Sequence, residues 1–243
     1  MEGAVPIVIV LGIETATERV GVAVADRDGV RAQFEATRGR RHAETVAPAI
    51  GIVCREADIG IEEISAIAVD VGPGLFTGLR VGLATGKSLA QALGVPMVGL
   101  TSLEVLAHPL RYVTANEEQT VVAVVDGRKG QVFYSFFRVG DGLIRRVSEP
   151  VAGSIDDLVA DIEDRSQDVM CVGDGARRYL ERLDDCRFAR LTDDSLDHPA
   201  VSALVHLARS KVSREEGVDQ LAIGAMYLRP PDAEINWQTR TSV

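Results

Sequence analysis

Apolar runs and turn signals along the chain predict a repeated order of strands and helices. β-Branched runs separated by polar turns are typical of antiparallel strands, and apolar residues that recur on one helical face are typical of a packed helix. The first set consists of strands at 7–14, 20–25 and 30–36, a helix at 42–56, a strand at 64–71, a helix at 77–93, a strand at 97–100 and a helix beginning at 103–107.

The same order restarts after residue 119. The second set consists of strands at 120–125, 131–138 and 143–149, a helix at 155–163, a strand at 169–172 and helices at 173–183 and 199–212. This is an internal duplication of a β-β-β-α-β-α unit, so we predict an α/β fold with two sheets, each covered by helices. We place the N-terminal lobe at 1–108 and the C-terminal lobe at 109–243, with an irregular tail after Leu228.

Composition and charge narrow the class of protein. The 243 residues are 46% hydrophobic and 26% charged, a balance typical of a globular domain. The formal net charge of −10 disfavours direct binding of nucleic acid by this chain, because phosphates are repelled. The three widely spaced cysteines suit a reducing compartment, and the sequence contains no apolar run long enough for a membrane span. We therefore expect a cytoplasmic protein.

A glycine-rich segment joins the strand at 64–71 to the helix at 77–93. Such a turn can present backbone N–H groups and a helix N-terminus to an anion. A carboxylate and hydroxyls in the first hairpin, at 14–17, could face the same cleft. We therefore consider a nucleotide-binding site formed by Thr15, Gly72, Gly74 and Thr77. The alternative is that both turns have only a structural role.

The helix at 77–93 also has a ridge that almost lacks side chains, since Gly78, Gly82, Gly86 and Ala90 recur at every fourth position. Each glycine inside a helix costs about 1 kcal/mol relative to alanine. A close backbone approach by another element would offset that cost. Two elements could make this approach: the sheet of the protein itself, or a helix of another subunit.

Four segments together resemble the TsaB (YeaZ) family: 13–15 (IET), 72–80 (GPGLFTGLR), 96–104 (PMVGLTSLE) and 125–128 (VDGR). Weaker matches lie at 172–176 and 227–229. The resemblance implies the two-lobed architecture of actin, Hsp70 and the sugar kinases (the ASKHA fold), in agreement with the duplication. Glu14 stands where the family usually has Asp, and Asp70 where it tends to have a small residue.

The resemblance also implies a function. TsaB proteins are partners of the related transferase TsaD, which forms N6-threonylcarbamoyladenosine beside the anticodon of tRNA. TsaD carries two histidines one helical turn apart, whereas this chain has Ser102 and Leu106 at the matching positions. Since neither can replace an imidazole as a metal ligand, we expect a non-catalytic subunit that binds and activates a TsaD-type transferase, with no catalytic residue and no metal site. The alternative is an enzyme of the same superfamily, similar to a metallopeptidase or a small-molecule kinase.

The family implies that the two helices of the first lobe form the partner interface. The interface residues we select are His42, Val46, Ile50, Phe76, Gly78, Arg80, Gly82, Gly86 and Ala90. The implied partners are the transferase, a TsaE-type ATPase and, only indirectly, tRNA, with a homodimer when the chain is alone. No cofactor is expected apart from ADP or ATP considered at the partner interface.

Overall fold

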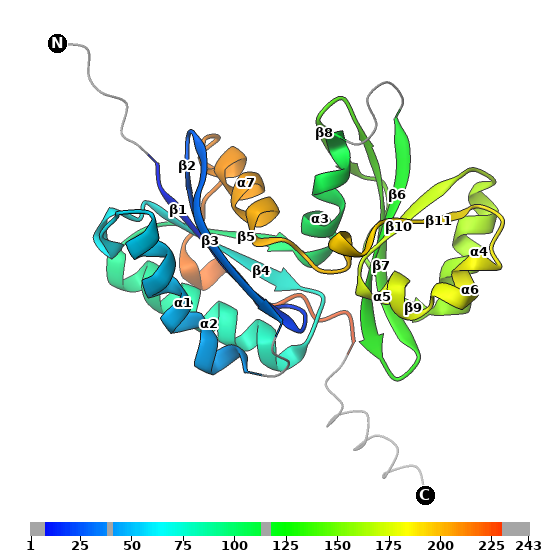
Figure 1. The fold of residues 1–243 in the computed structure, drawn as a ribbon, viewed down its shortest axis with the longest axis horizontal. Coiled ribbons are helices and arrows are strands. Elements are labelled where there is room, and N and C mark those ends of the chain that lie inside the picture. Colours follow the sequence, from blue (N-terminus) through cyan, green and yellow to red (C-terminus); the bar gives the residue numbers. More distant parts are fainter. Residues whose placement is uncertain (1–7, 38–40, 113–117, 230–243) are drawn as a thin grey trace, which may run out of the picture.

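The computed structural model describes residues 8–37, 41–112 and 118–229, which form two β-sheets, each carrying helices (Figure 1). The first sheet has the order β3-β2-β1-β4-β5. Its strands are β1 (Val10–Glu14), β2 (Arg19–Asp26), β3 (Gly29–Thr37), β4 (Ala66–Gly72) and β5 (Met97–Thr101). β1 runs antiparallel to β2 and parallel to β4, and β4 runs parallel to β5.

The continuous apolar runs of β1 and β4 place these strands in the middle of the first sheet. Every residue of β1 is buried, as are all residues of β4 except Val71. Strands covered on both faces lack polar alternation for this reason. β3, at the edge, alternates between exposed and half-buried positions along most of its length.

Three helices cover the first sheet. α1 (His42–Glu56) and α2 (Phe76–Leu93) pack on one face, and α7 (Val201–Val212) packs on the other (Figure 1). α2 ends at Gly94, whose φ of +68° is readily adopted only by glycine. The bounds of α1 are those predicted from the sequence, and α2 begins one residue earlier than predicted.

The second sheet has the order β11-β10-β6-β7-β8, with β9 also pairing with β7. Its strands are β6 (Gln119–Arg128), β7 (Gln131–Gly140), β8 (Leu143–Arg146), β9 (Val151–Ser154), β10 (Val169–Val172) and β11 (Ala189–Leu191). Its helices are α3 (Ser102–Ala107), α4 (Ile155–Arg165), α5 (Asp174–Arg178) and α6 (Leu180–Asp184). Short 3-10 turns lie at Ile61–Glu63, His108–Tyr112, Asp194–Leu196 and Gln220–Ala222.

The two sheets repeat one topology, which confirms the predicted duplication. Read from β8, the second sheet runs β8-β7-β6-β10-β11, which corresponds strand by strand to β3-β2-β1-β4-β5. α3 covers the face of the second sheet that is nearer the first lobe, and α4, α5 and α6 cover the other (Figure 1). No helix within the described ranges has both the length and the apolar character that crossing a bilayer requires.

The structure differs from the predicted division into 1–108 and 109–243. α7 packs on the first sheet, and Val218 forms a β-bridge with Met97 of β5. Met226 then donates its N–H to Val71 of β4 at 2.7 Å. The chain therefore returns to the first lobe after completing the second. The single helix expected at 173–183 is broken at Tyr179, and the expected irregular tail lies, beyond Arg229, outside the described residues.

Candidate partner-binding site

The glycine-rich turn sets the start of α2 against the first hairpin. Gly72 has a φ of +101°, and a Cβ on Gly74 would overlap the backbone of Ala16. The Leu75 N–H donates to the Ala16 carbonyl at 2.7 Å. Only glycine permits both the positive φ and the close approach of two backbones. The turn therefore anchors the N-terminal end of α2 to the β1–β2 hairpin.

The glycine ridge of α2 packs against the protein's own sheet, and this corrects its assignment as a partner surface. A Cβ on Gly78 would overlap the Thr15 carbonyl, and one on Gly82 would overlap the Thr15 hydroxyl. A Cβ on Gly86 would lie 2.6 Å from Val69 Cγ1. With Ala90 also buried, the ridge lets α2 approach β1 and β4 and leaves no room there for a second subunit.

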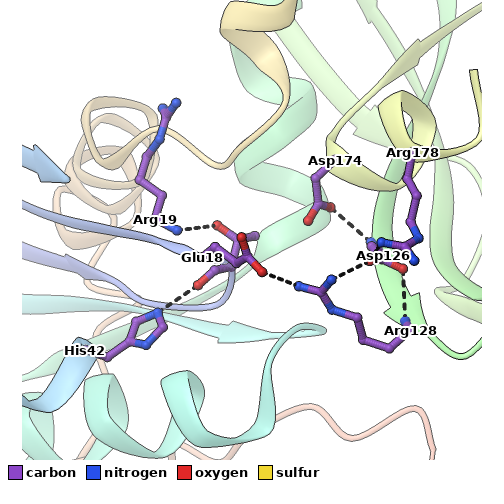
Figure 2. Close-up of polar contacts among 8 residues, drawn as sticks. Glu18, Arg19, His42, Asp126, Arg128, Asp174 and Arg178 are labelled. Atoms are coloured by element: carbon purple, nitrogen blue, oxygen red, sulfur yellow. Dashed lines mark hydrogen bonds and ion pairs between the residues drawn. The ribbon is translucent and has the colours of Figure 1, made fainter. Parts of the chain in front are cut away.

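Three further residues selected for the interface also face inward. The α1 residues His42, Val46 and Ile50 are buried on the side of the helix that packs on the first sheet. His42 Nε2 lies 2.8 Å from the Thr17 carbonyl oxygen, so the imidazole joins α1 to the first hairpin (Figure 2). Their apolar spacing marks the packed face of α1 rather than a surface that a partner could reach.

Phe76 and Arg80 are the two selected interface residues that are exposed. The Phe76 side chain is 39% exposed, and its ring lies 5.4 Å from that of Tyr227. The Arg80 guanidinium lies 3.8 Å from the Phe76 ring centroid, a cation–π arrangement. These side chains lie at the N-terminal end of α2, beside an inter-lobe pocket of about 450 Å³ that Phe133 also lines.

Sequence reasoning missed the residues that form the outward side of the two helices. The charged Glu44 and Arg55 of α1 are exposed on this side, and between and around them the exposed residues are mostly small. We call the following residues the outer face: Ala43, Ala47, Pro48 and Gly51 on α1, and Arg80, Ala84, Ser88 and Gln91 on α2. α1 and α2 lie side by side (Figure 1), so their outward sides form one surface. Small side chains allow the helices of another molecule to approach closely.

Three of the four residues considered for nucleotide binding are engaged inside the protein. The Thr15 hydroxyl donates to the Gly78 carbonyl at 2.9 Å and is buried. Gly72 and Gly74 pack on neighbouring backbone, and only Thr77 is exposed. These residues do not present a set of free donors to a phosphate, and nucleotide binding stays a prediction.

Charged residues of both lobes meet in a cleft between the β1–β2 hairpin of the first lobe and the β6–β7 hairpin of the second (Figure 2). Arg128 Nη2 lies 2.7 Å from Glu18 Oε1 of the first lobe, and Arg128 Nη1 lies 3.1 Å from Asp126. The Asp126 carboxylate also forms an ion pair with Arg178 at 3.5 Å, and the backbone N–H of Asp126 donates to the Asp174 carboxylate. Burial raises the pKa of Asp174 to about 6, opposed by the Asp126 N–H. A phosphate entering here would compete with Glu18 for Arg128.

We expect the inter-lobe ion pair to contribute little to stability. Because Glu18 and Arg128 have side chains 47% and 40% exposed, Glu18→Gln should lower the free energy of unfolding by no more than about 1 kcal/mol. Urea unfolding at low and high salt measures this. A loss above about 2 kcal/mol would contradict the expectation for an exposed pair.

The positions that match the histidine pair of TsaD do not fit a metal. Ser102 Oγ donates to Asp70 Oδ1 at 2.7 Å, and Leu106 is buried in the apolar core. Within the described ranges, no group of three or more His, Cys, Asp and Glu side chains is placed to hold an ion. The residues at this point of the fold therefore support packing rather than metal ligation.

Comparisons with known proteins give one consistent relationship. A family model described as "TsaD: tRNA N6-adenosine threonylcarbamoyltransferase" matches residues 32–237. The TsaB biosynthesis protein of Bacillus subtilis is 25% identical over 94% of this chain and 97% of its own length. The transferase of Novosphingobium aromaticivorans is 30% identical over 72% of this chain but only 54% of its own length. The solved structure of YeaZ from Pseudomonas aeruginosa superposes with a TM-score of 0.75 at 25% identity, covering 91% of this chain and 100% of that one.

Proposed function

The chain belongs to the TsaD (tRNA N6-adenosine threonylcarbamoyltransferase) family, and we propose that it is the non-catalytic subunit that binds and activates a TsaD-type transferase. The reaction that it would support is the formation of threonylcarbamoyladenosine in tRNA, the modification that the name of its B. subtilis relative gives for that protein. The outer face of α1 and α2 would hold the transferase.

The observation that carries this proposal is the contrast between the two sides of these helices. On the inward side, α1 packs on β2 and β3 and α2 packs on β4 and β1, whereas Ala47, Gly51 and Ala84 lie exposed on the outer face. A stable interface buries roughly 1,200–2,000 Å² in total. Two adjacent helices of 15 and 18 residues offer a surface on that scale. In the absence of the transferase, a second copy of the chain could occupy the same surface and give the homodimer that we propose for the isolated protein.

The chemistry of the residues supports an accessory role. At the two positions where TsaD-type proteins have histidines, this chain has Ser102 and Leu106. The Ser102 hydroxyl is hydrogen-bonded to Asp70, and the Leu106 side chain has no atom that can bind a metal. The net charge of −10 opposes direct contact with tRNA, which we assign to the transferase. A TsaE-type ATPase would join the assembly through the same complex.

A reconstituted reaction tests the proposal. Purified transferase, threonylcarbamoyl adenylate and tRNA should form product at least about tenfold faster when this chain is added, and the chain without transferase should form none. Nucleoside analysis of the tRNA by mass spectrometry measures the product. Product formation by the chain alone, or turnover of ATP by the chain alone, would favour the superfamily enzyme instead.

A further inference from the structure

Two carboxyl groups are completely buried at the ends of neighbouring parallel strands. Glu14 closes β1 with 0% of its surface exposed, and Asp70 lies near the end of β4 with 1% exposed. β1 and β4 are paired in register just before this point, with Ile13 opposite Val69. Burying even one carboxylate without a partner is strongly unfavourable, so two at one place require an explanation.

Each carboxyl group has one oxygen that accepts hydrogen bonds and one that has no donor. Glu14 Oε1 accepts from the Ala16 N–H at 2.7 Å, and Asp70 Oδ1 accepts from the Gly72 N–H at 2.6 Å and from Ser102 Oγ at 2.7 Å. Glu14 Oε2 and Asp70 Oδ2 are buried without a hydrogen-bond partner. Two ionised carboxylates cannot satisfy each other because neither has a donor, whereas a proton on one of them supplies the donor that both lack.

The charged groups that act on the pair from the surrounding elements are acidic. Glu35 acts from β3 and Glu104 from α3. Arg19 pairs with Glu35 at 3.6 Å. Gly21 of β2 is paired with Glu14, and the apolar Val201 side chain of α7 packs over Gly21, so that a Cβ there would overlap it.

We infer that Glu14 and Asp70 form a proton-binding site, in which one proton is held between Glu14 Oε2 and Asp70 Oδ2 as a carboxyl–carboxylate hydrogen bond. The pair then carries a single negative charge, which the Ala16 N–H, the Gly72 N–H and the Ser102 hydroxyl solvate. Burial raises the pKa of Glu14 well above its ordinary value, and the charge of Asp70 raises it further. Burial raises the pKa of Asp70 as well, although its hydrogen bonds oppose this.

The shared proton links the two turns that position the N-terminal end of α2, the β1–β2 turn and the glycine-rich turn. Glu14 binds the backbone of the first hairpin at Ala16, and Asp70 binds the glycine-rich turn at Gly72. Ala16 and Leu75, one from each turn, are themselves hydrogen-bonded. Loss of the proton would place two like charges between the turns, so the position of the N-terminal end of α2 depends on the protonation of this site.

Stability as a function of pH tests the inference. The folded pair keeps a proton that the same carboxyl groups release when the chain unfolds, because their ordinary pKa values lie near 4. The stabilisation is therefore complete at low pH and falls as pH rises, until the folded pair ionises. In Glu14→Gln, the amide N–H replaces the carboxyl O–H and cannot titrate. The ratio of the unfolding constant of the wild type to that of Glu14→Gln should rise by up to about tenfold per pH unit above roughly pH 5.

The matched control is Glu18→Gln, which removes an exposed carboxylate from the same hairpin and should keep the wild-type slope. Asp174 and His198, whose pKa values the fold also shifts, are present in both the wild type and Glu14→Gln, so their contributions cancel in that ratio. Parallel pH curves for the wild type and Glu14→Gln would overturn the inference.

A second measurement holds even if Glu14→Gln fails to fold. Infrared difference spectra of the wild type with isotope-labelled glutamate and aspartate should show one protonated buried carboxyl group at neutral pH, and its absence would overturn the inference. Mg²⁺ or Ca²⁺ added alone should leave the melting temperature unchanged. Stabilisation by either ion that disappears in Asp70→Asn would overturn the inference in favour of a cation site.

Discussion

Gly78→Ala should destabilise the protein, whereas the same substitution at Gly51 should stabilise it. Alanine normally stabilises a helix interior by roughly 0.5–1 kcal/mol relative to glycine, and Gly51 on α1 has nothing within 4 Å of the place where a Cβ would lie. A Cβ on Gly78 of α2 would overlap the Thr15 carbonyl. Because backbone atoms cannot move aside cheaply, we expect a loss of about 1–3 kcal/mol or more.

Thermal and urea unfolding of the two variants measure this difference in sign. In a chain of this size, 1 kcal/mol corresponds to roughly 2–4 °C in Tm, so the two variants should melt on opposite sides of the wild type. Gly82→Leu should destabilise the fold for the same reason as Gly78→Ala, since its side chain would overlap the Thr15 hydroxyl. A Gly78→Ala variant as stable as Gly51→Ala would show that α2 does not lie this close to the turn between β1 and β2.

Ala84→Arg should weaken binding of the transferase by about 100-fold, or about 2.7 kcal/mol, and leave the stability of the chain unchanged. Ala84 is exposed on the outer face, so the longer side chain can extend into solvent in the free protein. In the complex it would have to fit between closely packed helices with its charge desolvated. Isothermal titration calorimetry with the purified transferase measures the affinity.

Ala152→Arg is the matched control for this prediction. Ala152 is exposed on β9 of the second sheet, away from α1 and α2 (Figure 1), so the same change of size and charge should leave the affinity unchanged. If Ala84→Arg binds the transferase as tightly as the wild type does, the outer face is not the interface.

The strand and helix order could be read from the sequence because it depends on local patterns. The buried strands are continuous apolar runs, and α1 has the predicted bounds because its apolar spacing and its flanking turns agree. The packing partner of an amphipathic helix is not a local property. α7 is predicted as a helix, but nothing in its own residues says that it crosses back to the first sheet.

The packing partner of the glycine ridge is not given by the spacing of its glycines. The spacing identifies a close approach but not the element that makes it. Leu79 and Leu83, each adjacent to a ridge glycine, are buried, whereas Arg80 and Ala84 lie on the opposite side of the helix. This apolar stripe beside the glycines is the signal that the ridge faces the core.

The pairing of Glu14 with Asp70 could not be predicted from sequence spacing. The two residues lie 56 positions apart, and only the parallel pairing of β1 with β4 brings them together. Asp70 has no recognisable role in the sequence alone, whereas in the fold it binds Gly72 and Ser102 and faces the second buried carboxyl group. Long-range strand pairing is thus what turns an unexplained acidic residue into part of a site.

The most direct test of the partner role is site-specific photo-crosslinking in the assembled complex. A photoreactive residue placed at Ala47 or Ala84 on the outer face should form a covalent adduct with the transferase. One placed at Leu143, which is 71% exposed on β8 of the second sheet, should form none. Adducts from position 143 together with none from positions 47 and 84 would contradict the account.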